Sequence, residues 1–259
     1  MRSLSALSLL GILLLAACAG GGRPIDSPVS AQSSPDAARQ RAQVHTELGM
    51  AYLGGGQLNV ALDEARIALS ADSGYPLAYN LLGLAHMQMK ETARAEEYFE
   101  QGLRLAPNDP EIGNNMGWFL CQSGREARSF AYFEAAAKNP LYATPARPLA
   151  NAGLCAARLK DYKRAEDYLN GALRLDPGLL DGLYLLADVL YQQQRYGEAR
   201  ARLAEVHRRA EPSATSAWLG LRIERKSGDR EAELRWATQL RRKFADSVEH
   251  RKMMQGAFE

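Results

Sequence analysis

The sequence predicts an all-α fold, a solenoid of about six helix–turn–helix repeats. The stretch from Pro76 to Pro107 carries two successive amphipathic helix patterns. One face of each helix is formed by residues at helical spacing: Leu82, Gly83 and His86 in the first, and Ala95, Phe99 and Leu103 in the second. Neither helix can bury that face alone, so the unit requires copies of itself.

Small residues mark those copies along the chain. In the first helices they are Gly49, Gly83, Gly117, Gly153, Ala187 and Gly220, at intervals of 34, 34, 36, 34 and 33 residues. In the second helices they are Ala61, Ala95, Ser129, Ala165, Ala199 and Ala232. This pattern resembles the tetratricopeptide repeat (TPR), a helix–turn–helix unit of about 34 residues. The resemblance implies a right-handed superhelical solenoid. It forms one domain over residues 39–245, because each repeat packs only on its neighbours.

Residues 1–17 read as a lipoprotein signal peptide. Arg2 precedes an apolar run, residues 4–15, that is too short to remain in a membrane as a span. The run ends in Leu15-Ala16-Ala17-Cys18, which resembles the lipobox of bacterial lipoproteins. The resemblance implies cleavage before Cys18, lipidation of its thiol and, with Ala19 next, an outer-membrane protein that faces the periplasm. An ordinary signal peptide with a cysteine near its cleavage site is the alternative.

Two segments flank the predicted solenoid. Residues 18–38 hold the lipidated cysteine and are rich in Gly, Ser and Pro without apolar periodicity, which predicts a flexible tether. Residues 246–259 form a C-terminal tail. The formal net charge of +2 gives no reason to expect binding to nucleic acid.

The two remaining cysteines, Cys121 and Cys155, lie one repeat apart on predicted first helices. They should therefore lie at nearly the same height on adjacent helices, and in an oxidising compartment a disulfide is favoured. Two buried thiols that fill apolar space are the alternative. The bridge would link the repeats on either side of the irregular 36-residue interval.

The sequence offers no recognisable catalytic or metal site. The histidines His45, His86, His207 and His250 are scattered without metal-ligand spacing. We therefore expect no enzymatic activity, no cofactor, no metal and no small-molecule substrate. An overlooked enzyme would instead show a polar pocket with clustered titratable groups.

A solenoid of this kind presents its first helices on a concave surface. The resemblance to the TPR family implies partner contacts near fixed positions around each small marker residue. The candidates are Asn80, Leu84 and Met87 in the second repeat; Asn114, Asn115 and Trp118 in the third; Asn151 and Leu154 in the fourth; Tyr184, Asp188 and Tyr191 in the fifth; and Trp218 and Leu221 in the sixth. Packing of some of these aromatic residues between repeats is the alternative. The residues needed for a C-terminal carboxylate clamp are missing.

A narrower resemblance lies in residues 114–121, NNMGWFLC, followed by residues 151–155, NAGLC. Together with the lipobox and the repeats, they look like the type IV pilus biogenesis lipoproteins of the PilF/PilW type. That family implies a pilotin, which binds the pilus secretin subunit and promotes its outer-membrane localisation and multimer assembly or stability. A TPR lipoprotein scaffold for another envelope assembly, such as outer-membrane protein insertion or cell-wall hydrolase regulation, is the alternative.

Overall fold

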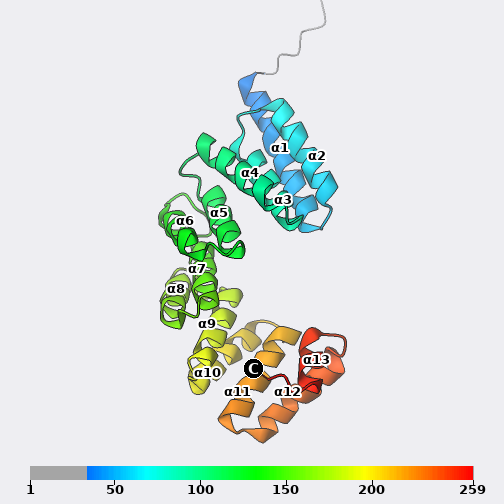
Figure 1. The fold of residues 1–259 in the computed structure, drawn as a ribbon, viewed down its shortest axis with the longest axis vertical. Coiled ribbons are helices and arrows are strands. Elements are labelled where there is room, and N and C mark those ends of the chain that lie inside the picture. The colour runs from blue at the N-terminus through cyan, green and yellow to red at the C-terminus, as the bar shows by residue number, and fades with distance from the viewer. Residues whose placement is uncertain (1–33, 259) are drawn as a thin grey trace, which may run out of the picture.

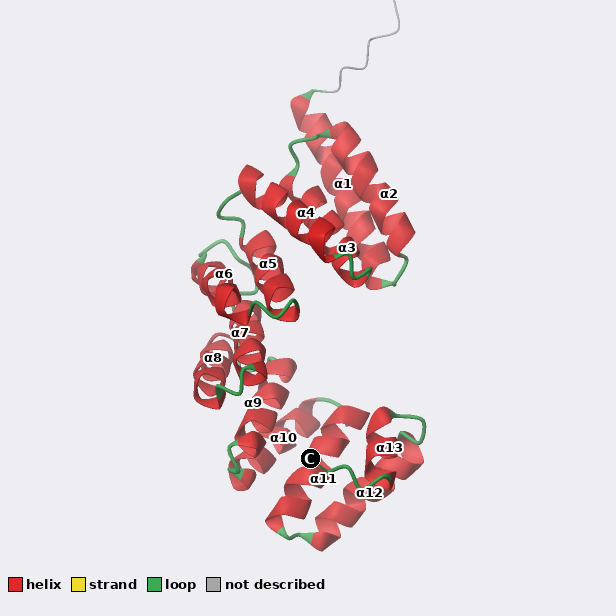
Figure 2. Cartoon of the chain, in the orientation of Figure 1, coloured by secondary structure: helices red, strands yellow, loops and turns green. Residues whose placement is uncertain are grey.

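The computed structural model describes residues 34–258, and the part of the chain that it describes is helical without strands (Figure 2). The helices follow one another as antiparallel pairs joined by short turns. Their bounds are α1 Pro35–Gly54, α2 Leu58–Ala71, α3 Pro76–Gln88, α4 Thr92–Leu105, α5 Pro110–Gln122, α6 Glu126–Lys138, α7 Ala146–Arg158, α8 Tyr162–Leu175, α9 Leu180–Gln192, α10 Tyr196–Arg209, α11 Ala214–Ser227, α12 Arg230–Lys243 and α13 Val248–Met254.

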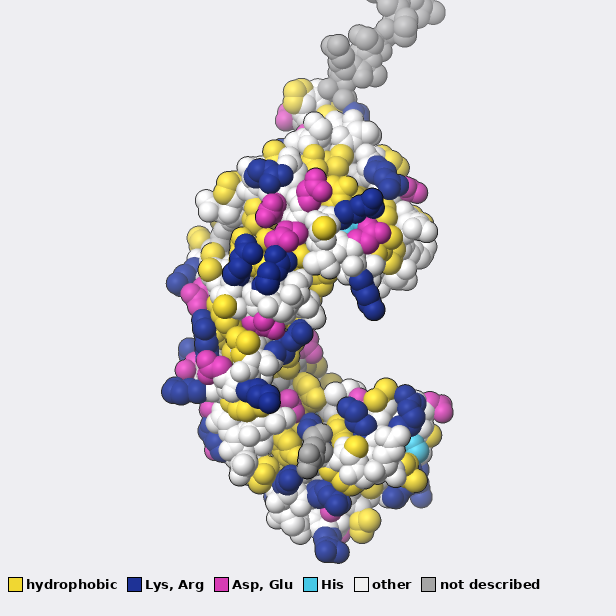
Figure 3. All heavy atoms as spheres, viewed as in Figure 1, with side chains coloured by type: hydrophobic (Ala, Val, Ile, Leu, Met, Phe, Trp, Pro, Cys, Tyr) yellow, Lys and Arg dark blue, Asp and Glu magenta, His cyan; other side chains and the backbone are white. Residues whose placement is uncertain are grey.

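Six helical pairs stack into a curved solenoid, which confirms the predicted fold class (Figure 1). Each first helix packs on its own second helix and on the first helix of the next repeat. In Figure 1, α5 and α7 lie on the inner side of the curve while α6 and α8 lie on its outer side. The surface view is hollowed between the N-terminal and C-terminal repeats (Figure 3).

The small marker residues allow the two helices of a repeat to approach closely. A Cβ atom on Gly83 would lie 2.7 Å from the Phe99 ring, and one on Gly117 would lie 2.8 Å from the Phe133 ring. Phe99 and Phe133 are fully buried. In these two repeats the small residue of the first helix thus faces a large ring four positions after the small marker of the second helix.

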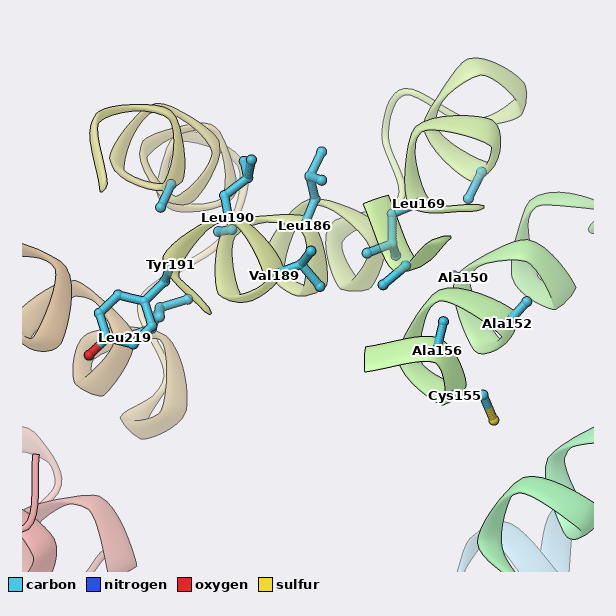
Figure 4. Close-up of a cluster of buried hydrophobic side chains, with 14 of the residues drawn as sticks. Ala150, Ala152, Cys155, Ala156, Leu169, Leu186, Val189, Leu190, Tyr191 and Leu219 are labelled. Atoms are coloured by element: carbon cyan, nitrogen blue, oxygen red, sulfur yellow. The ribbon is translucent and has the colours of Figure 1, made fainter. Parts of the chain in front are cut away.

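The core is a chain of connected clusters rather than a single centre. The largest cluster runs from the third repeat to the sixth and includes Phe133, Leu169, Leu186, Leu190 and Leu219. Figure 4 shows residues of α7, α8, α9 and α11 that belong to it. Contacts between neighbouring repeats thus add to those within each repeat.

The boundaries of the solenoid differ from the expected ones at both ends. Helix α1 begins at Pro35, before the expected start at residue 39, and Ser34 caps it by accepting a hydrogen bond from the Ala37 N–H. The expected C-terminal tail contains α13, whose Met253 is buried against the sixth repeat. The signal peptide, Cys18 and most of the expected tether lie outside the described residues. Within residues 34–258, no helix has the length and apolar character required to cross a membrane.

Candidate partner-binding surface

Four asparagines form a hydrogen-bonded row across three consecutive first helices. The Asn115 Nδ2 donates to the Asn80 Oδ1 at 3.1 Å, which links α5 to α3. The Asn114 Nδ2 donates to the Asn115 Oδ1 at 3.3 Å within α5, and the Asn151 Nδ2 donates to the Asn114 Oδ1 at 3.0 Å, which links α7 to α5. We call Asn80, Asn115, Asn114 and Asn151 the asparagine ladder.

Apolar side chains run beside the asparagine ladder. Leu84, Trp118 and Leu154 lie three or four residues after ladder asparagines, so they lie on the same helix faces one turn further along. All three are partly exposed. Met87, one turn beyond Leu84, packs against the cluster that contains Phe99 and is also partly exposed. This part of the predicted surface therefore combines amide groups with accessible apolar anchors.

The junction between α5 and α7 is held by two further contacts. The structure joins Cys121 and Cys155 in a disulfide with a Cα–Cα distance of 5.9 Å, which lies within the usual range. Both cysteines are fully buried, so Cys121 does not face a partner. On the surface, the Arg158 guanidinium donates to the Gln122 Oε1 at 2.9 Å. The disulfide and the ladder together fix the spacing of the two helices that carry Trp118 and Leu154.

The candidate residues of the fifth repeat contact a largely buried arginine on α11 that the sequence analysis did not single out. The Arg222 guanidinium pairs with Asp188 at 3.2 Å and lies 4.7 Å from the centre of the Tyr191 ring. Burial is the largest influence on the pKa of Asp188 and raises it, while Arg222 opposes that rise. Burial also raises the pKa of Tyr184 to about 12, so this phenol stays protonated. Asp188 and Arg222 are 34 residues apart, and opposite charges one repeat apart were the signal that could have found Arg222.

Several of the candidate side chains are not exposed in the structure. Asn80 and Asn114 are buried within the ladder. Tyr191 is covered in part by Arg222 and Tyr196, and Trp218 and Leu221 pack with Met253 and Phe258 of the C-terminal segment. Tyr191 and Trp218 thus serve as packing residues in this conformation, which agrees with the alternative that some aromatic residues pack between repeats. The accessible part of the surface lies on α3, α5, α7 and the first half of α9.

One histidine contact superficially suggests catalysis. The His207 Nε2 lies 3.0 Å from the Ser216 Oγ. Ser216 is buried, and its side chain completes the capping box of α11 with Ser213. The pair therefore stabilises a helix start rather than presenting a nucleophile. Within residues 34–258, no group of three or more His, Cys, Asp or Glu side chains is arranged to hold a metal ion.

Comparison with known proteins identifies the repeats and their relatives. Family models described as tetratricopeptide repeat match residues 46–110 and 156–221. TPR scaffolds are typically non-enzymatic modules for protein interaction. The type IV pilus assembly protein PilF of Pseudomonas aeruginosa is 26% identical over 224 residues, which cover 86% of this chain and 88% of PilF.

Two solved structures of such proteins share the fold. A crystal structure of PilW, described as a widely conserved type IV pilus biogenesis factor, is 30% identical with a TM-score of 0.77, and the match covers 83% of this chain and 99% of PilW. The structure of Pseudomonas aeruginosa PilF is 25% identical with a TM-score of 0.73, over 85% of this chain and 99% of PilF. The chain belongs to the PilF/PilW family of TPR proteins of type IV pilus biogenesis.

Proposed function

We propose that this protein is an outer-membrane lipoprotein pilotin that binds the type IV pilus secretin subunit and promotes its outer-membrane localisation and multimer assembly. Membership of the PilF/PilW family supports a role in pilus biogenesis. The observation that carries the partner-binding half of the proposal is the asparagine ladder with Leu84, Trp118 and Leu154 beside it.

The ladder has unused hydrogen-bonding capacity. A side-chain amide has two N–H donors and a carbonyl oxygen that accepts two hydrogen bonds. Asn115 and Asn151, both partly exposed, each donate one N–H to the ladder and keep the other. An extended polypeptide presents backbone donors and acceptors at regular intervals, and its apolar side chains can enter pockets beside the bonded backbone. We infer that an extended secretin segment lies along the ladder and places an apolar side chain against Trp118.

Anchoring and binding are assigned to separate parts of the chain in this proposal. Lipid on Cys18 provides the sorting signal and the membrane anchor, since several acyl chains give stable attachment where one gives marginal attachment. The ladder lies on α3, α5 and α7, within the folded repeats. A Cys18→Ala chain should therefore still bind the secretin but fail to carry it to the outer membrane.

A titration of the full chain with the periplasmic region of the secretin tests the binding surface. Trp118→Ala should weaken binding by about 30-fold or more, because large aromatic anchors at the centre of an interface dominate affinity. Asn115→Ala should weaken binding by about 5- to 10-fold, the value of one or two net hydrogen bonds. Asn59→Ala is the matched control, because Asn59 is an exposed asparagine on the second helix α2.

Thermal unfolding of each variant separates a binding defect from a folding defect. If the folded Trp118→Ala and Asn115→Ala chains both bound the secretin with full affinity, the asparagine ladder would not be the binding site. No binding by the wild-type chain would contradict the secretin as partner and favour a scaffold for another envelope assembly.

A further inference from the structure

The inner face of the sixth repeat is occupied by the end of the chain itself. The Phe258 ring stacks on the Trp218 indole with a centroid distance of 5.5 Å and an interplanar angle of 23°. The Arg225 guanidinium lies 4.0 Å from the centre of the same Phe258 ring, and Arg225 also donates to the Glu233 carboxylate at 2.7 Å. Trp218 and Arg225 thus form a site in which an aromatic ring contacts both an indole and a cation.

A defined turn brings Phe258 to this site. Helix α13 ends in a Schellman motif, in which the Gly256 N–H donates to the Met253 carbonyl and the Ala257 N–H donates to the Lys252 carbonyl. Gly256 has φ +69°, a left-handed conformation that suits glycine. The chain therefore reverses at Gly256 and returns Phe258 toward α11.

Phe258 is held less firmly than the helix before it. Met253 is buried in the cluster of Leu221 and Leu240, which fixes α13 to the repeats. Phe258 is only partly buried, and its N–H donates to the nearby Gly256 carbonyl rather than to the solenoid. The ring can therefore leave Trp218 while α13 stays in place.

We propose that Trp218 and Arg225 form a binding site for an aromatic side chain of the partner protein, and that Phe258 occupies this site in cis and competes with the partner. The nature of the occupant follows from the ring that fills the site in this structure. Helix α11 follows α9 in the row of first helices, so the site extends the candidate surface toward the C-terminal end of the solenoid. The inference deepens the proposed function, on which it rests for the identity of the partner.

The first arm of the test uses a small aromatic peptide and no secretin. The full chain with Phe258→Ala is titrated with acetyl-Gly-Ala-Phe-amide while the Trp218 indole N–H is followed by NMR, with the signal assigned from Trp218→Phe. We expect a saturable shift in the Phe258→Ala chain, at least fivefold weaker binding to the wild-type chain, and no shift with acetyl-Gly-Ala-Ala-amide. No shift in the Phe258→Ala chain, or equal binding to both chains, would overturn the site.

The second arm measures affinity for the periplasmic region of the secretin. Removal of the competing ring in Phe258→Ala should tighten binding at least threefold, whereas Met254→Ala, which alters an exposed residue of α13, should leave it unchanged. Secretin binding without this gain contradicts the competition and leaves the proposed function standing. Peptide binding without any secretin binding contradicts the partner and leaves the aromatic site standing. A wild-type dimer that dissociates on Phe258→Ala would overturn the inference, because the ring would then serve self-association.

Discussion

At the scale of single residues, the repeats depend on close contacts that tolerate no extra atoms. Gly83 faces the fully buried Phe99 ring, and a Cβ atom at this position would lie closer to the ring than a normal contact allows. Sequence reasoning could identify these positions because a small residue and a large residue recur in one register. It could not identify the ladder bonds, since Asn114 and Asn115 are adjacent in sequence but only their side-chain directions decide which neighbour each one contacts.

Gly83→Ala should lower the free energy of unfolding by about 1–3 kcal/mol, the usual effect of overpacking a core. The added Cβ would lie 2.7 Å from the Phe99 ring. Gly197→Ala is the matched control: no atom lies within 4 Å of its Cβ position, so the same substitution on α10 should raise stability by up to about 1 kcal/mol. Chemical denaturation measures both, and equal effects of the two substitutions would contradict the close-contact explanation.

His207 should make stability depend on pH. Burial lowers its pKa below the ordinary value of 6.5. Below that pH the unfolded chain binds a proton here that the folded chain binds less readily, so the free energy of unfolding falls as the pH decreases. His207→Gln should therefore lose less stability than the wild-type chain between pH 7.5 and pH 5.5, measured by urea denaturation. Parallel losses in the two chains would exclude this residue as a cause.

At the scale of helices and turns, a residue in the left-handed conformation follows every first helix. These residues are Gly56, Lys90, Gly124, Lys160, Gln194 and Gly228. Each lies two positions after the end of its helix except Gly228, which directly follows α11. Glycine, lysine and glutamine all occupy this position. No single residue type therefore marks it in the sequence, although the helices on either side were predictable from their apolar periodicity.

Exchanging residue types at equivalent turns tests this geometry. Lys90 has φ 61° and Gly124 has φ 72°. Lys90→Gly should raise the free energy of unfolding by up to about 1 kcal/mol, because glycine avoids the cost of a left-handed conformation but gains entropy when unfolded. Gly124→Lys should lower it by about 1–2 kcal/mol. If both substitutions change stability in the same direction, backbone conformation is not the controlling factor.

The disulfide between α5 and α7 should contribute substantially to stability. It closes a loop with a sequence separation of 34 residues. On the chain-entropy model, such a loop is worth about 3.5–4 kcal/mol. Denaturation with and without dithiothreitol should show this loss in the wild-type chain, while the double variant Cys121→Ala, Cys155→Ala should not respond to the reductant. An unchanged midpoint in the reduced wild-type chain would contradict the expected contribution.

Helix α13 shows why one element was not predicted as a helix. It has seven residues, too few for a clear apolar period, and its stability comes from burial of Met253 against the sixth repeat. Because α13 and Phe258 cover Trp218 and Leu221, the missed helix also explains the error in their predicted exposure.

At the scale of the whole molecule, the asparagine ladder and the site formed by Trp218 and Arg225 lie on one series of first helices, α3, α5, α7, α9 and α11. Figure 1 shows the curved course of these helices. The repeat count, the fold and the family were predictable because they depend on patterns that recur along the chain. Which candidate residues are exposed and which are buried was not predictable, since burial depends on contacts between segments far apart in sequence.

The most direct test of the proposed pilotin role is deletion of the gene in a piliated strain, followed by membrane fractionation and a gel assay for heat-stable secretin multimers. Without the protein, secretin multimers should be lost and secretin monomers should remain in the inner membrane. Restoration by the wild-type gene, but not by a gene encoding Cys18→Ala, should show that delivery requires the lipid anchor. Normal multimers in the outer membrane of the deletion strain would contradict the pilotin role.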